Sequence, residues 1–385
     1  MKTGNRYCIL VSGMVVQFCA GIIYMWSVFK QPVADYLKWS ADSAGLTSSI
    51  MLAMFVFGII LGGRAQDKLG PGRVTFAGSV LIGMGMAATS LATPNTPWLV
   101  WVTYGVVGGF GVGTVYTSTI AVVQKWFPDR RGFASGMTVS AFGFSLVVFA
   151  PLATALIKAL DVMSVFFIFG MSFLVICGVS SLFLQNPPQQ AAAAQAAQRR
   201  MYSPSQILKT RQFYLLVGGL FFTLPAYFIL NPNFKSLALE RGLSENLAVL
   251  GVMITGIGSA CGRLAVSWVS DKIGRKAAML SIAGIILAAT LLMIIAQGYL
   301  YLVCITLIAF GFGGAAGVYA AMTAESFGSK HSGMNFGLVM LGFGASALVF
   351  PLISKDLTVS FILAASTCAV AMLLVALMRN PKAMQ

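Results

Sequence analysis

Long apolar stretches recur along the whole chain and leave few folds open to it. Hydrophobic residues make up 58% of the 385 residues, and charged residues make up 9%. A soluble domain typically carries about 25% charged residues, and about 20 apolar residues let a helix cross a hydrocarbon core. Lipid offers no hydrogen bonds to an open backbone, so each stretch is expected to be a helix. Twelve stretches meet this description: 7–29, 46–63, 74–92, 98–122, 134–157, 162–184, 212–234, 246–268, 277–296, 299–323, 334–354 and 358–378.

The net charge of +15 is distributed in a way that assigns sides of the membrane. With the N-terminus inside, eighteen of the 25 Lys and Arg residues fall in inner loops and tails, six fall at outer ends, and Arg263 lies within a span. Short loops rich in Lys and Arg stay cytoplasmic. The positive charge therefore indicates which loops are cytoplasmic, and it does not indicate a nucleic-acid partner. We expect a multi-pass monomer in the lipid bilayer of a bacterial inner (plasma) membrane, with both termini cytoplasmic.

Neither the cysteines nor the acidic residues suggest a catalytic centre. The six cysteines fall within or at the edges of spans, and no two of them form a CxxC pair. All ten acidic residues fall in loops or at span ends. Because no nucleophile, base or metal-ligand cluster lies in mid-span, we expect no enzyme, no metal and no cofactor.

An internal repeat divides the chain into two similar halves. The repeated elements are Asp67-Lys68-x-Gly70 with Asp271-Lys272-x-Gly274, Gly109-Phe110-Gly111 with Gly311-Phe312-Gly313, and Phe142-Gly143 with Phe343-Gly344. The matches stay in step across four helices. We expect an all-α fold of two pseudo-symmetric six-helix bundles, residues 1–184 and 211–385, joined by a cytoplasmic linker at 185–210. Such a pair suits a carrier that binds its substrate near the midplane and works by alternating access.

Charged residues at the ends of the repeated loops suggest a latch between conformations. An Asp there can meet a helix N-terminus or a neighbouring Arg, and such a contact can form in one conformation and break in another. The alternative is an ordinary charged turn. The candidate latch residues are Asp67, Lys68, Arg73, Asp271, Arg275, Arg130 and Arg131.

These motifs resemble a known family over essentially the whole chain. Gly63-x-x-x-Asp67-Lys68-x-Gly70 and its copy are similar to the signature loop of the major facilitator superfamily. The stretches K-W-F-P-D-R-R-G-x-A-S-G at 125–136 and E-S-F-G-S-K-H-x-G-x-N-F-G at 325–337 resemble loops of the oxalate/formate antiporter-like group, which neighbours the monocarboxylate transporters. The resemblance implies a twelve-helix secondary transporter of a small carboxylate.

Arg263 is the only cation placed well inside a span, and it is the main candidate for a substrate-binding residue. Thr255, Ser259, Arg263 and Ser267 are spaced by four and form one polar stripe. Arg263 precedes Asp271 by eight residues, so it lies roughly 12 Å from the cytoplasmic end of its helix. A guanidinium binds a planar carboxylate bidentately and stays charged. The alternatives are bonds to backbone carbonyls or a side chain extended toward Asp271.

The resemblance also indicates the valence of the substrate. An Arg at this place binds the substrate carboxylate in the family, and the dicarboxylate-exchanging members have a Lys in the eleventh helix. Alignment through Gly344 puts Phe343 at that position here. A dianion would leave one charge unpaired in a low-dielectric site. A short monocarboxylate such as lactate, pyruvate, formate or acetate is therefore expected, rather than oxalate.

Other polar and aromatic residues of the spans are candidates for the lining of the site. They are Tyr116, Tyr319, Thr114, Asn231, Tyr227, Tyr24, Phe343 and Ser259. Tyr116 and Tyr319 occupy matching places in the repeat. Thr114 lies about 200° around its helix from Tyr116, so both face one cavity only if the helix is irregular. The alternative for each polar residue is an interhelical hydrogen bond.

The coupling ion follows least directly from the sequence. Arg263 cannot change its protonation, and Ser259 stands where some monocarboxylate carriers have an Asp. Glu240, near the outer end of span seven, could carry a proton, or the proton could travel on the substrate. We expect proton-coupled symport of a monocarboxylate. Carboxylate exchange of the oxalate/formate type and a non-transporting anion sensor are the alternatives.

Overall fold

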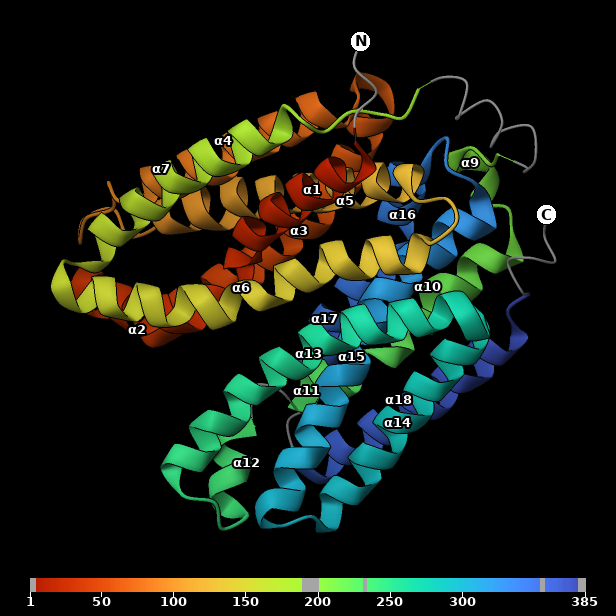
Figure 1. The fold of residues 1–385 in the computed structure, drawn as a ribbon. Coiled ribbons are helices and arrows are strands. Elements are labelled where there is room, and N and C mark those ends of the chain that lie inside the picture. Colours follow the sequence, from red (N-terminus) through yellow and green to blue (C-terminus); the bar gives the residue numbers. More distant parts are fainter. Residues whose placement is uncertain (1–4, 189–200, 231–233, 354–356, 380–385) are drawn as a thin grey trace. The chain divides into compact units, whose positions relative to one another are not determined.

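The computed structural model describes residues 5–188, 201–230, 234–353 and 357–379, and in these ranges it is helical with no strand (Figure 1). The helices before the linker are α1 (Arg6–Ala20), η1 (Gly21–Met25), α2 (Trp26–Leu37), α3 (Ala41–Leu69), α4 (Pro71–Thr89), η2 (Trp101–Gly108), α5 (Gly109–Trp126), α6 (Arg131–Ala159) and α7 (Val162–Ser181). Those after it are α9 (Pro204–Ile207), α10 (Arg211–Thr223), α11 (Pro225–Leu230), α12 (Phe234–Glu240), α13 (Glu245–Ile273), α14 (Arg275–Ile295), α15 (Gly298–Phe327), α16 (Ser332–Val339), α17 (Leu341–Ile353) and α18 (Leu357–Leu377).

Eleven helical segments in the described part of the chain are long and apolar enough to cross a membrane. Each coincides with one of the twelve predicted spans, and the remaining prediction, 74–92, falls on the 19-residue helix α4. The predicted all-α, twelve-helix membrane fold is thus confirmed. Helices generally extend past the predicted bounds, because their polar last turns remain helical: α3 continues through Asp67 and Lys68, and α13 through Asp271.

The helices pack into two compact units. Unit 1 takes the residues up to Pro128, those from Ala141 into the linker, and Lys330–Leu338. Unit 2 takes Asp129–Ser140, the chain from the end of the linker to Ser329, and the residues from Val339 on. The start of α6 therefore packs with unit 2, and α16, except its last residue, packs with unit 1. The halves expected from the sequence, 1–184 and 211–385, do not include this exchange of short segments.

Two stretches of irregular helix meet in unit 1. Residues Gly21–Met25 form a 3₁₀ turn within the first span, and Trp101–Gly108 form a π-helix at the start of the fourth. The Tyr104 hydroxyl donates to the Ile22 carbonyl at 3.0 Å and so joins the two. Such distortions free backbone groups and often lie at functional positions. In unit 2, the seventh span breaks at Leu224, between α10 and α11, because Pro225 has no backbone N–H to donate to the carbonyl four residues before it.

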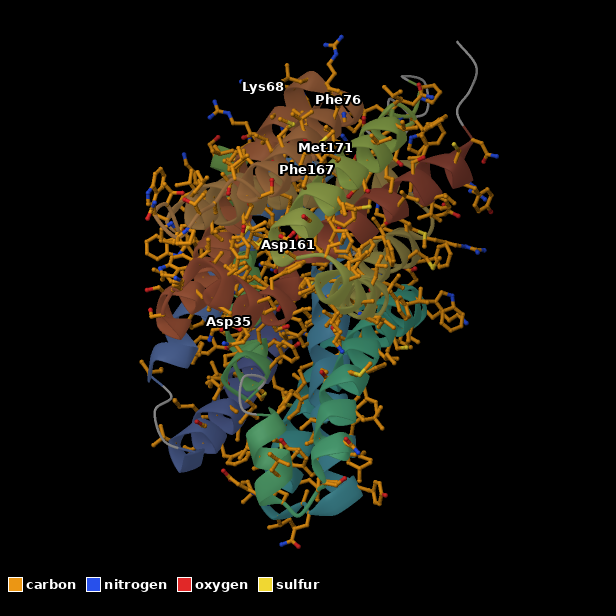
Figure 2. All side chains as sticks on the ribbon, turned by 90° about the vertical axis from the view of Figure 1, so that its left-hand side faces the viewer. Asp35, Lys68, Phe76, Asp161, Phe167 and Met171 are labelled. Carbon is orange, nitrogen blue, oxygen red and sulfur yellow. The ribbon has the colours of Figure 1, made fainter. Side chains whose placement is uncertain are left out.

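Unit 1 shows the surface expected of a protein in lipid. Helices α4 and α7 pack side by side, and they expose Phe76, Phe167 and Met171. In Figure 2 these three side chains lie between Lys68 at one end of unit 1 and Asp35 and Asp161 toward the other. An apolar band bounded by charged ends is what a bilayer requires of the surface that faces it.

Candidate functional site

Close packing of α13 against α15 fixes the helix that carries Arg263. A Cβ on Gly262 would collide with the Phe310 carbonyl, and one on Gly313 would collide with the Ser259 carbonyl. A Cβ on Gly317 would lie 2.8 Å from the Arg263 carbonyl. Small residues allow this backbone approach, which supplies van der Waals packing where no hydrophobic driving force acts between helices.

Arg263 is buried within unit 2, with 2% of its surface exposed. Its Nη1 donates to the Val139 carbonyl of α6 at 3.2 Å. One turn earlier on α13, the Ala260 carbonyl accepts from the Ser140 hydroxyl at 2.9 Å. The first part of α6 thus lies along the polar stripe of α13, where Ser259 and Ser267 are also buried. The backbone-carbonyl contact foreseen for Arg263 is present, and substrate contact stays a prediction.

An aromatic cluster surrounds Phe343, the position where the sequence predicts no cation. The Phe343 ring lies 5.3 Å from Phe228 and 6.2 Å from Phe312. The Phe312 ring stacks on Tyr227 at 3.9 Å. Phe312 precedes Gly313, which packs against Ser259, so this cluster adjoins the helix pair that positions Arg263. The surroundings of Phe343 are therefore apolar.

A second aromatic cluster lies in unit 1. The Tyr116 ring lies 5.2 Å from Phe142 and 5.3 Å from Phe55, and the Tyr24 ring lies 5.4 Å from Phe142. The structure thus brings Tyr24 and Tyr116 to one group. It places Thr114 elsewhere: its hydroxyl donates to the Phe110 carbonyl, and α3 and α4 approach its methyl group closely.

The register of the repeat in the structure differs from the one expected for the two tyrosines. Matching helix contacts pair Gly58 with Gly262, Phe110 with Phe310, and Gly113 with Gly313. In this register the counterpart of Tyr116 is Ala316, and the counterpart of Tyr319 is Thr119. The expectation that Tyr116 and Tyr319 match is therefore wrong by three residues. Both Thr119 and Tyr319 face the first helix of their half: Gln17 donates to Thr119 at 2.9 Å, and a Cβ on Gly219 would lie 2.6 Å from the Tyr319 hydroxyl.

The other predicted residues lie apart from these clusters. Tyr319 is completely buried against α10. Asn231 lies outside the described residues. Glu240, the candidate proton carrier, ends helix α12 and is exposed.

The predicted latch residues of unit 2 form an ion-pair network. The Asp271 carboxylate accepts from the backbone N–H groups of Gly132 and Phe133 at 3.0 and 2.8 Å, and so caps the start of α6. Arg275 donates to Asp271 and to Glu325, both at 2.6 Å. Arg131 is buried and donates to the Ala324 carbonyl at 3.1 Å. A carboxylate at a helix N-terminus is stabilised by the helix dipole and by its hydrogen bonds.

Unit 1 contains the same device with different charges. The Asp67 carboxylate accepts from the N–H groups of Gly333 and Met334 at 3.3 and 3.0 Å, at the start of α16. The Gln66 amide, oriented by its neighbours, donates to Asp67 at 2.9 Å and accepts from Lys125 at 3.2 Å. Pro71 stands at the counterpart of Arg275, and Lys125 stands at the counterpart of Glu325. The cation is therefore supplied by the end of α5 in unit 1 and by the start of α14 in unit 2.

Sequence reasoning missed Glu325, Gln66 and Lys125 as partners of the capping carboxylates. The signal that could have found them is their position, since Lys125 and Glu325 match in the repeat with opposite charge. Conversely, Lys68, Arg73 and Arg130 are exposed, and the Arg130–Asp129 pair is 3.9 Å apart. Across the described residues, no group of three or more His, Cys, Asp or Glu could hold a metal ion.

The fold and these clusters define a multi-pass membrane protein with a buried cation among packed helices and a repeated helix-capping device. The sequence profile of the Major Facilitator Superfamily matches residues 9–351. The chain belongs to this superfamily, and it is a transporter and not an enzyme.

Known proteins agree with this membership. The chain is 27% identical over 346 residues to the oxalate:formate antiporter of Oxalobacter formigenes, which covers 87% of this chain and 80% of that protein. It is 26% identical over 357 residues to monocarboxylate transporter 13 of Bos taurus, with 88% and 76% covered. Among solved structures, the proton:xylose symporter XylE is similar with a TM-score of 0.79 at 14% identity, over 97% of this chain and 96% of that one. The human organic anion transporter MFSD10 has a TM-score of 0.75 at 14% identity, with 96% and 99% covered.

Proposed function

We propose that the protein carries a small monocarboxylate anion by alternating access, and that Arg263 binds the carboxylate. The observation that carries this proposal is the burial of Arg263 inside a membrane-spanning helix. A cation at such depth costs at least ~2.5–3.5 kcal/mol on insertion scales. One N–H group of the guanidinium donates to the Val139 carbonyl at 3.2 Å. The planar guanidinium fork also suits a carboxylate, which accepts from it bidentately.

The aromatic surroundings of Phe343 favour a substrate with one carboxylate. Phe228 and Phe312 contact Phe343, so this side of unit 2 offers apolar surface where a second carboxylate would need a cation. The relatives named as an oxalate:formate antiporter and a monocarboxylate transporter support a small carboxylate as the substrate class. Lactate, pyruvate, formate and acetate fit this description best.

Each capping Asp would act as a latch that holds the start of one helix. Asp271 holds α6 within unit 2, and Asp67 holds α16 within unit 1. In each case the helix continues, beyond the held turn, into residues of the other unit. Release of a cap would free that turn, which is a two-state element of the kind that alternating access requires.

Proton symport is the proposed coupling, and carboxylate exchange is the second candidate because of the antiporter relative. The two are separated by uptake of labelled lactate or pyruvate into proteoliposomes, with an inward proton gradient or with internal counter-anion. Symport predicts accumulation driven by the gradient into vesicles without internal anion. Uptake that requires internal anion and does not respond to the proton gradient would show that the protein is an exchanger and not a symporter. Binding of the acid without any uptake would show that it is a sensor.

A further inference from the structure

A crevice on the membrane-facing side of unit 1 has the two-part character of a lipid site. Its volume is about 560 Å³, and it lies where α2, α4 and α7 meet. Tyr36, Ser90, Asp161 and Ser164 contribute polar groups, and Phe167 and Ile168 contribute apolar surface. Figure 2 shows Asp161 above Asp35 and next to Phe167, with Met171 and Phe76 continuing the apolar band away from it. The charge distribution of the chain predicts that this end of the helices lies at the outer surface.

Asp161 is the charged group of the crevice, and its carboxylate can still accept a hydrogen bond from a cation. Its carboxylate accepts from the backbone N–H groups of Met163 and Ser164 at 2.8 and 3.0 Å and from the Ser164 hydroxyl at 2.5 Å. The hydroxyl and backbone of Ser164 hold the pKa of Asp161 below its usual value, so the group is ionised at neutral pH. Two carboxylate oxygens offer about four acceptor sites, so at least one remains for a donor in the crevice.

The surroundings suit an amphipathic ligand whose polar end carries an ammonium group. The exposed Phe167 and Ile168 are on the side that faces hydrocarbon, one to two turns along α7 from Asp161. The exposed cations Lys38, at the end of α2, and Lys158, in the last turn of α6, belong to the same end of unit 1. Lys38 follows the lining residue Tyr36 by two positions, and Lys158 precedes Asp161 by three. Cations that attract a lipid phosphate thus stand near the crevice along the chain, while Asp161 offers a counter-charge to an amine.

We propose that this crevice binds a phospholipid with a primary-amine headgroup, the phosphatidylethanolamine class, from the outer leaflet. The ammonium donates to Asp161, and an acyl chain lies along Phe167 and Ile168. Such a lipid would fasten α2, α4 and α7 at their outer ends, because all three line the crevice.

The test is lipid retention by the purified transporter, measured by native mass spectrometry after addition of phosphatidylethanolamine, phosphatidylcholine and phosphatidylglycerol with the same acyl chains. We expect the ethanolamine lipid to be retained preferentially and Asp161→Asn to reduce its retention about tenfold, to the level of the choline lipid. Asn caps a helix as well as Asp does, so α7 keeps its start. Asp35→Asn is the matched control, since Asp35 is an exposed carboxylate at the same end that does not line the crevice.

A second pair of variants tests the apolar part. Phe167→Ser should lower retention of the ethanolamine lipid, whereas Phe76→Ser, at a similarly exposed Phe on the same face, should leave it unchanged. Equal retention of the three lipids would overturn the proposal. So would an Asp161→Asn variant that keeps the preference, or one that loses all three lipids equally.

Discussion

At the residue scale, Arg263 shows what a sequence can and cannot say about a buried charge. Its burial follows from its place in an apolar stretch, and the structure places it with 2% of its surface exposed. Its contact with the Val139 carbonyl could not be predicted, because that contact depends on which turn of α6 packs on α13. Phe343 was predicted to leave its position uncharged, and the contacts with Phe228 and Phe312 give that position its apolar character.

Replacement of Arg263 should separate transport from folding. We expect Arg263→Ala to lower monocarboxylate uptake by roughly 100-fold or more, because loss of one partner of a buried charge pair costs on the order of 3 kcal/mol. Arg263→Lys should keep a small part of the activity, since Lys keeps the charge and loses the bidentate fork. The measurement is initial uptake into proteoliposomes, with exposed Arg73→Gln as the control. Wild-type uptake by a folded Arg263→Ala protein would remove Arg263 from the site.

Phe343→Lys should change the valence that the site accepts. A cation there would give a second carboxylate its counter-charge, so oxalate should compete better with labelled lactate in this variant than in the wild type. Phe343→Leu controls for the lost ring and should leave oxalate a poor competitor. If both variants compete alike, the aromatic position does not set the valence.

At the element scale, apolar length predicted the helices well, and short motifs predicted their register less well. All twelve spans fall on helices, because the length needed to cross lipid leaves little freedom. The Gly-Phe-Gly motif gave the wrong register between the two halves. Glycines recur at every second residue in both copies, so the copies can be aligned in more than one way. The contacts of Gly113 with Phe55 and of Gly313 with Ser259 decide the alignment, and they are long-range. The same limit hid Glu325, whose role depends on a neighbouring helix bringing Arg275 to it.

The close approach of α13 to α15 predicts a strong effect from one methyl group. Gly262→Ala would force the Phe310 backbone away, and we expect it to lower the free energy of unfolding by about 1–3 kcal/mol. Gly284→Ala is the matched control, since nothing lies within 4 Å of a Cβ at Gly284 on α14. That variant should be neutral or slightly stabilising, because Ala favours a helix over Gly. Thermal unfolding in detergent compares the two, and equal effects would argue against the packing described.

The Arg275 network predicts a loss of stability that a second substitution restores in part. Arg275→Ala leaves Asp271 and Glu325 with like charges near one another, and we expect a loss on the order of 3–5 kcal/mol. Adding Glu325→Gln removes one of those charges and should recover part of the loss. The exposed Arg130→Ala should change little. A double variant no more stable than Arg275→Ala would mean that Glu325 contributes nothing through this pair.

At the scale of the whole molecule, the two halves share their backbone arrangement but differ in the side chains at matching places. In both halves an Asp near the end of one helix caps the start of another. The helix that carries the Asp ends three residues later at a glycine with positive φ, Gly70 at 89° and Gly274 at 92°. The cation near the Asp differs between the halves: it is Lys125 in unit 1 and Arg275 in unit 2. The residue at the place of Arg263 also differs, because its counterpart in α3 is Ile59. The sequence predicted two similar halves, and it could not predict that the starts of α6 and α16 pack with helices of the other half. Among the described residues, the cation buried in the middle of a span is Arg263, and it lies in unit 2.

The most direct test of this account is calorimetric titration of the purified transporter with pyruvate and oxalate, which are small acids of one and two carboxylates. We predict that pyruvate binds at least about tenfold more tightly than oxalate and that Arg263→Ala abolishes its binding. Oxalate binding as tight as that of pyruvate, or an unchanged affinity for pyruvate in Arg263→Ala, would contradict a site built on one buried arginine for one carboxylate.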